Sequence, residues 1–207
     1  IETGKRIASA AAADLKRVEL ELGGNDAAVV LDDVDVALVA DGLFEYAFSN
    51  CGQVCDAIKR VYAPERIYDQ LVDALADRAR AARVGAGRDD TTQLGPLTNE
   101  QQRRRVSELV SDAVAAGATV VTGGKSPDRA GYFYEPTVLA GLAGQERIVT
   151  EEQFGPALPI VSYRDVDEAI RSANDSKFGL GASVWSGDPE RAATLAPQLE
   201  AGTVWAN

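Results

Sequence analysis

The stretch AAVVLDDVDVALVADGLFEYAFSNCGQVCDAIKRVYAP, residues 27–64, decides the fold of this chain. Its first residues, AAVVL, form the short apolar run of a buried strand. Asp32 and Asp33 then predict the cap of a helix over residues 34–49, because aspartate is a preferred helix N-cap. The run RVYAP predicts a second strand, which Pro64 ends. A strand, a long helix and another strand in this order predict an α/β fold with a mainly parallel sheet flanked by helices.

Strand-like and helical segments alternate along the rest of the chain as well. The Ala-rich opening, residues 1–16, predicts a helix, and VELEL at residues 18–22 predicts a strand that ends at Gly23 and Gly24. The segment 85–96 is rich in Gly and Thr and predicts a loop. Further helices are expected at residues 66–83, 99–116, 165–174 and 188–199, and further strands at residues 118–124, 132–141, 156–163, 181–186 and 201–207.

The composition limits the partners and the setting of the protein. Of the 207 residues, 45% are hydrophobic and 26% charged, enough for a core and a polar surface. The formal net charge of -11 argues against nucleic acid and anionic membranes as partners, since both attract clustered Lys and Arg. No apolar run approaches the roughly 18 residues of a membrane helix. Two cysteines do not make a disulfide framework, which favours a reducing, cytoplasmic setting.

Histidine is absent from the sequence, and its absence narrows the chemistry. Ser-His-Asp and Cys-His hydrolases and His-based zinc sites are excluded. Two thiols alone make a poor metal site, so no metal is expected. Catalysis has to rest on Cys, Glu, Asp, Lys, Tyr or backbone groups.

Cys51 and Cys55 are the candidate nucleophiles. A thiolate attacks and a thiol does not, so the reactive cysteine needs activation by backbone dipoles, by a nearby Lys or Arg, or by a carboxylate acting through water. Gly52 allows a sharp turn where the helix hands over to the strand, so Cys55 is expected at that turn with its own N–H facing the substrate. Lys59 and Arg60 are candidates to add positive potential. Cys51 is expected to be a packed, inert thiol near the end of the helix.

A second interpretation stays open on the residues alone. A free cysteine is most often buried and unreactive, which would make the chain an α/β domain without a catalytic thiol. Taken alone, Glu21 and Glu152 are ordinary acids, each beside or near another Glu, and Phe154 is an ordinary core residue.

The segment FSNCGQVC, residues 48–55, holds a phenylalanine and an asparagine followed by Gly-Gln-Val-Cys. In this it resembles the nucleophile signature of the aldehyde dehydrogenase superfamily. Six further segments match that family in order, which makes a chance match implausible. They are LELGGN at 20–25, LGPLTN at 94–99, GYFYEPTVL at 131–139, EEQFGP at 151–156, FGLGASVWS at 178–186 and AGTVWAN at 201–207. The resemblance covers the whole chain and implies the Rossmann-like catalytic domain of an aldehyde dehydrogenase.

The resemblance also implies a reaction, the NAD(P)-dependent oxidation of an aldehyde to a carboxylic acid. It makes Cys55 the nucleophile and Cys51 a non-catalytic neighbour. A thiohemiacetal and then a thioester would form on Cys55, with the Cys55 N–H meeting the oxyanion. It makes Glu21 the general base that activates water for hydrolysis of the thioester, a step that partial burial of the carboxylate would favour.

The resemblance assigns the cofactor contacts to three residues. Glu152 and Phe154 match the residues that hold the nicotinamide-side ribose, and Leu22 lies where the family's backbone approaches the nicotinamide. The cofactor implied is either NAD or NADP. The choice between them stays open, because the residue that reads the ribose 2′ position would precede residue 1.

The resemblance further implies that residues 1–24 are the last helix and strand of an NAD-binding domain, and that residues 25–207 are the catalytic domain without its C-terminal loop and oligomerisation strands. The parent protein is expected to act on a small-molecule aldehyde as a homodimer or homotetramer. The chain alone is expected neither to bind NAD nor to transfer hydride. Two alternatives for the isolated chain stay open: a weak thiol esterase that uses Cys55 and Glu21, and a catalytically silent structural or interaction module.

Overall fold

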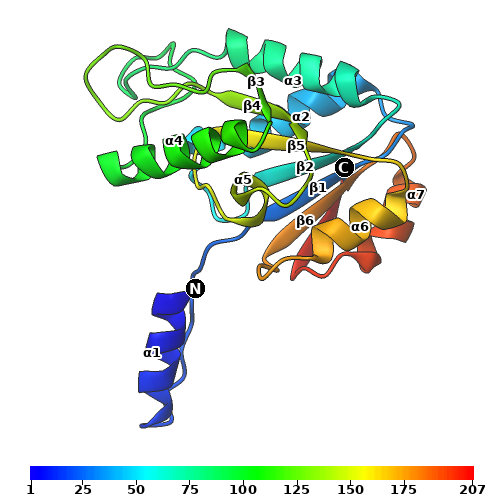
Figure 1. The fold of residues 1–207 in the computed structure, drawn as a ribbon. Helices are drawn as coiled ribbons and strands as arrows, with labels where there is room; N and C mark the ends of the chain where they lie inside the picture. Colours follow the sequence, from blue (N-terminus) through cyan, green and yellow to red (C-terminus); the bar gives the residue numbers. More distant parts are fainter.

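A seven-stranded sheet runs through the computed structural model, which describes residues 1–207 (Figure 1). The strand order is β3-β4-β5-β2-β1-β6-β7, and every neighbouring pair is parallel except β3 with β4. The predicted α/β fold with a mainly parallel sheet is therefore confirmed. The strands are β1 Asp26–Val30, β2 Ile58–Pro64, β3 Thr119–Thr122, β4 Thr137–Leu142, β5 Ala157–Tyr163, β6 Gly181–Trp185 and β7 Thr203–Ala206.

Helices cover both faces of the sheet (Figure 1). The helices are α1 Glu2–Ala12, α2 Val36–Phe48, α3 Tyr68–Ala81, α4 Glu100–Ala115, α5 Arg147–Thr150, α6 Val166–Asn174 and α7 Pro189–Leu195, with 3₁₀ turns η1 Ser49–Gly52 and η2 Ala196–Gln198. None of the helices is both long and apolar enough to span a membrane. On the buried strand β1, Ala28 and Val30 face α2 and α3, whereas Ala27 and Val29 face α4, α6 and α7. Both faces of the strand are apolar because both are covered.

The parallel pairing decides where the connecting segments meet. In the sheet, β5, β2, β1 and β6 are consecutive neighbours that run in the same direction. The residues that precede parallel neighbours lie at the same edge of a sheet. Residues 23–25, 53–57, 151–156 and 179–180 therefore come together at the amino ends of these four strands.

The strand predicted at residues 18–22 is wrong. Residues 16–25 connect α1 to β1 without any strand partner. A strand requires a neighbouring backbone for its ladder of hydrogen bonds, but α1 and the segment after it lie apart from the layers of the sheet (Figure 1). The alternation of apolar and acidic residues therefore marks an extended segment only, in which Val18 is 44% exposed.

The strand predicted at residues 132–141 is correct only in its second half, since β4 begins at Thr137. The residues before it pair with loops. The Tyr132 carbonyl accepts a hydrogen bond from Leu97 N–H over 2.9 Å, and the Glu135 N–H donates to Lys125 over 2.9 Å. The other predicted helices and strands are all present, and residues 85–96 form the predicted loop.

The cap of α2 is Asp35, and the predicted cap at Asp32 and Asp33 is wrong. The Asp35 carboxylate accepts hydrogen bonds from Ala37 N–H (2.9 Å) and Leu38 N–H (3.1 Å). Asp32 and Asp33 precede the helix by too many residues to reach these groups, and they pair with Arg191 instead.

Replacing Asp35 with alanine removes both capping bonds and is expected to lower the free energy of unfolding by about 1 kcal/mol. Urea unfolding measures this change. The matched control is Asp73→Ala in α3, at an exposed position that caps no helix. The control is expected to stay within about 0.5 kcal/mol of the wild type. Equal losses in the two variants would contradict the assignment of the cap.

Candidate active site

Cys55 lies in a tight turn that connects η1 to β2. The Ala57 N–H donates to the Val54 carbonyl over 3.3 Å, which closes the turn around Cys55 and Asp56. Cys55 is half-buried, and its N–H makes no hydrogen bond within the chain. The predicted position of Cys55 at a sharp turn between a helix and a strand is therefore confirmed.

The backbone before this turn adopts an unusual conformation. Asn50, Cys51 and Gly52 have positive φ angles of 49°, 60° and 72°, in a region that residues with a Cβ rarely occupy. A Cβ on Gly52 would also lie 2.4 Å from the Gly155 carbonyl oxygen, so only glycine fits there. Cys51 is 1% exposed, and burial raises the pKa of its thiol to about 12. Cys51 therefore stays a protonated, packed thiol at neutral pH, as expected.

The side chain of Gln53 fastens the nucleophile segment to the loop before α4. Its Oε1 accepts a hydrogen bond from Thr98 N–H (2.8 Å), and its Nε2 donates to the carbonyls of Asn50 (3.1 Å) and Pro96 (3.3 Å). This side chain joins the segments CGQVC and LGPLTN, which are far apart in the sequence. The glutamine that precedes Cys55 by two residues thus has a structural explanation.

Two glycines bring the segment before β1 against the Cys55 turn. A Cβ on Gly24 would lie 2.7 Å from the Cys55 carbonyl oxygen and 2.6 Å from Asp26 Oδ1. A Cβ on Gly23 would lie 2.0 Å from the Glu152 carboxylate, and the Gly24 N–H donates to that carboxylate over 3.0 Å. The contact therefore joins three segments that precede three parallel strands.

Glu152 is part of this contact, and Phe154 follows it by two residues. Burial raises the pKa of the Glu152 carboxyl, and the Lys59 ammonium opposes that rise. Phe154 has a positive φ of 46°, and its carbonyl accepts a hydrogen bond from Gln102 Nε2 over 2.9 Å. The Lys59 ammonium lies 5.9 Å from the centre of the Phe154 ring.

Glu152 and Phe154 also line an open groove of about 660 Å³. Its walls come from α1, from α4 through Gln102 and Arg105, and from Lys177 and Phe178. The groove thus brings together Glu152 and Phe154, two of the three residues that the resemblance assigns to the cofactor, whereas Leu22 does not line it. It adds Gln102 and Arg105, which were not predicted.

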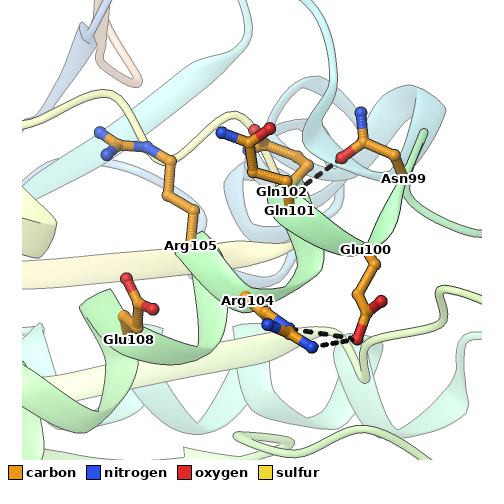
Figure 2. Close-up of a pocket in the computed structure, with 7 residues that line it drawn as sticks. All are labelled: Asn99, Glu100, Gln101, Gln102, Arg104, Arg105 and Glu108. Atoms are coloured by element: carbon orange, nitrogen blue, oxygen red, sulfur yellow. Dashed lines mark hydrogen bonds and ion pairs between the residues drawn. The ribbon is translucent and has the colours of Figure 1, made fainter.

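Gln102 and Arg105 are the main residues that the sequence analysis missed. They lie one turn apart on one side of α4, while Arg104 turns to the opposite side and pairs with Glu100 (Figure 2). Their spacing of three residues, on a helix that follows the LGPLTN segment, is the signal that could have identified them. The adjoining hollow on α4 has a volume of about 700 Å³. The seven side chains that line it, labelled in Figure 2, are all polar.

Of the two cations predicted near the nucleophile, one is there. Lys59 is 1% exposed, and its Nζ donates to the carbonyls of Val54 (2.7 Å) and Cys55 (3.1 Å). Arg60 is directed to the α6 side of the sheet, where it donates to the carbonyls of Asn25 and Ala173, each over 2.8 Å. Arg60 is therefore engaged elsewhere, although it follows Lys59 directly in β2.

Glu21 and Leu22 lie in the exposed segment that leads to the glycine pair. Glu21 is exposed and forms no hydrogen bond or ion pair. Leu22 packs on α1, where a Cβ on Gly4 would lie 3.0 Å from its Cδ2. No bond joins Glu21 to the Cys55 turn, and the roles of Glu21 and Leu22 remain predictions.

Comparison with known proteins gives a consistent picture. A family model described as "Aldehyde dehydrogenase family" matches residues 1–207. The mitochondrial aldehyde dehydrogenase of Leishmania tarentolae is 42% identical over 198 residues, which are 96% of this chain and 40% of that protein. The betaine aldehyde dehydrogenase of Bacillus subtilis is 38% identical over 211 residues, covering 100% of this chain and 43% of that protein. The chain thus spans about two fifths of the length of these relatives.

Solved structures share the fold. An aldehyde dehydrogenase of Mycobacterium tuberculosis, solved with NAD⁺, superposes with a TM-score of 0.95 at 37% identity, covering 99% of this chain and 43% of that chain. Aldehyde dehydrogenase C of Pseudomonas syringae, solved as a mutant with NAD⁺ and octanal, has a TM-score of 0.95 at 35% identity, covering 100% of this chain and 43% of that chain.

Replacing Gly24 with alanine tests the contact between the glycine pair and the Cys55 turn. The added Cβ meets a backbone oxygen, which cannot swing away, so the free energy of unfolding is expected to fall by about 1–3 kcal/mol. Iodoacetamide labelling of Cys55, located by mass spectrometry, is expected to change several-fold. The control is Gly87→Ala, where a Cβ meets nothing within 4 Å. Wild-type stability and labelling in Gly24→Ala would show that the contact is not tight.

Proposed function

This chain belongs to the aldehyde dehydrogenase family, and we propose that it carries the catalytic centre of an NAD(P)-dependent oxidation of an aldehyde to a carboxylic acid. The observation that carries the proposal is the convergence at Cys55. Cys55 is half-buried, and its N–H makes no hydrogen bond. Its turn contacts the glycine pair that follows Glu21, and that pair contacts the Glu152 carboxylate. The other cysteine, Cys51, is buried in the core.

The first step is addition of the Cys55 thiolate to the aldehyde carbon. A sulfur–carbon bond forms as the carbonyl π pair moves to oxygen, and the Cys55 N–H donates to the resulting oxyanion. NAD(P)⁺, when bound, supplies the acceptor of the hydride. Cys55 then carries a thioester. Glu21 takes a proton from water, the hydroxide attacks the acyl carbon, and the carboxylic acid leaves as the thiolate is regenerated.

The groove lined by Glu152 and Phe154 fits the cofactor. The Glu152 carboxylate is an acceptor for ribose hydroxyls, and the Phe154 ring offers an apolar face next to it. Arg105 supplies a cationic donor on the facing helix, suited to phosphates. The Gln102 Nε2 already donates to the carbonyls of Gln153 (2.8 Å) and Phe154 (2.9 Å), so its Oε1 is the group left for a cofactor hydroxyl. The relatives from M. tuberculosis and P. syringae were solved with NAD⁺, which supports NAD as the first cofactor to test.

The division of the chain and its assembly belong to the same proposal. Residues 1–24 belong to a cofactor-binding domain, and residues 25–207 form the catalytic domain. The substrate is a small-molecule aldehyde, and the whole protein forms a homodimer or homotetramer. The separation of α1 from the sheet (Figure 1) supports the boundary near residue 25.

Cys55→Ala, introduced into the complete protein, is expected to lower NAD⁺-dependent aldehyde oxidation by roughly 10³-fold or more, since no other group replaces the nucleophile. The reduced cofactor is followed by its absorbance. Cys51→Ala is the matched control, because it removes the other thiol and leaves Cys55 in place. It is expected to keep most of the activity. Turnover that survives in Cys55→Ala would exclude the proposed nucleophile.

A weak thiol esterase is the second candidate for the chain by itself. The observation that favours it is that Cys55 and its N–H are both positioned within residues 1–207, and acyl transfer from an activated ester needs no hydride acceptor. Hydrolysis of p-nitrophenyl acetate that disappears in Cys55→Ala would support this activity. If no Cys55-dependent hydrolysis is found, the chain by itself is the catalytically silent module.

A further inference from the structure

The Lys59 ammonium is enclosed by one turn of backbone. It donates to the carbonyls of Val54 (2.7 Å), Cys55 (3.1 Å) and Ala57 (3.1 Å), and the residue is 1% exposed. An ammonium has three N–H donors, so all of them are satisfied by the turn that holds the nucleophile.

An irregularity of the sheet places Lys59 there. Asp26 pairs with Ile58 and the next residue, Ala27, pairs with Arg60, so Lys59 is an extra residue in β2. An extra residue of this kind re-aims a side chain that would otherwise follow the alternation of the strand. The Lys59 side chain therefore turns back to the segment that precedes its own strand.

Burying this charge is costly. Burial lowers the pKa of Lys59, while Glu152, Asp26, Cys55 and Asp56 favour its charged form. An apolar side chain of similar length would fill the space without that cost. Core packing alone does not require an ammonium at this position, which directs attention to what its charge does to the turn.

The shortest of the three bonds is made to the peptide that joins Val54 to Cys55. The carbonyl of that peptide belongs to Val54 and its N–H belongs to Cys55. A trans peptide is planar, so its N–H points away from its carbonyl. A cation on the carbonyl oxygen fixes the plane, directs the N–H away from Lys59 and polarises the N–H as a donor.

We propose that Lys59 is a positioning residue for the oxyanion, acting through the Val54–Cys55 peptide. Its ammonium holds the carbonyl end of that peptide, so that the Cys55 N–H is oriented and strengthened as the donor to the oxygen of the tetrahedral adduct. The catalytic part of this inference rests on the proposed function. The hydrogen bonds themselves do not.

The first test is independent of activity. In protein labelled with ¹⁵N-cysteine, only Cys51 and Cys55 give amide signals. In Lys59→Met, the Cys55 amide proton is expected to move upfield, because the Val54 carbonyl of the same peptide has lost its cation. The Cys51 signal is expected to stay in place. Lys59→Gln, which keeps two donors without the charge, is expected to move it less. Lys125→Met removes an exposed cation outside the site and is expected to move neither signal.

The wild type provides a test that needs no variant. In protein labelled with ¹⁵N-lysine, the three hydrogen bonds predict that one ammonium exchanges its protons slowly and gives a sharp signal. If every ammonium exchanges as fast as an exposed one, Lys59 is not held by the turn and the inference is wrong.

Kinetics then separate positioning from general stability. Alkylation of Cys55 by iodoacetamide forms no oxyanion, whereas acylation by p-nitrophenyl acetate does. Lys59→Met is expected to slow acylation by about 10–100-fold, since an oxyanion donor is weakened, and to slow alkylation less than about 3-fold. Equal effects on both rates, or none on acylation, would overturn the inference.

The outcomes also distinguish this inference from the proposed function. If the wild type shows no Cys55-dependent acylation, the proposed nucleophile fails, and the amide and ammonium signals still decide whether Lys59 holds the peptide. If the wild type is acylated at Cys55 and Lys59→Met is acylated at the same rate, only the role of Lys59 fails.

Discussion

The parallel pairing of β5, β2, β1 and β6 is the constraint on which the site depends. It brings the residues before these strands to one edge of the sheet, where glycine is needed at positions 23 and 24 because the Cys55 carbonyl and the Glu152 carboxylate approach so closely. Ligand sites of open α/β sheets usually lie at the carboxyl ends of the strands. This site lies at the amino ends, so its residues are found just before the strands in the sequence.

Charge balance at this edge is achieved without histidine. The Lys59 ammonium donates to backbone carbonyls, and the acidic groups Glu152 and Asp26 favour its charged form. Burial raises the pKa of Asp26 to about 6, and one of its carboxylate oxygens has no partner. The two thiols differ through burial as well, since Cys51 is enclosed by the core and Cys55 is not. Chemically similar groups at this edge thus differ in their exposure to solvent.

Most of the fold could be predicted because its elements carry strong local signals. The apolar run before α2 and the helix predicted at residues 66–83 hold in the structure. The two errors in strand prediction share one cause, since residues 18–22 and 132–136 have strand-like composition but no strand beside them. Whether an extended segment joins a sheet depends on its neighbours, and the local pattern does not contain them. The cap at Asp35 was missed because three nearby aspartates are alike in sequence.

The sequence by itself determined the α/β class, the family, and the two thiols among which the nucleophile had to be sought. Local patterns of apolar, acidic and glycine residues suffice for these three conclusions, because each pattern can be recognised from a few consecutive residues. Only the tertiary structure decided that Cys51 is sealed, that Gln102 and Arg105 border the groove, and that Lys59 turns to Val54 while Arg60 turns to α6. These outcomes depend on strand order, on one extra residue in β2 and on burial, which are properties of segments that meet only when the chain is folded.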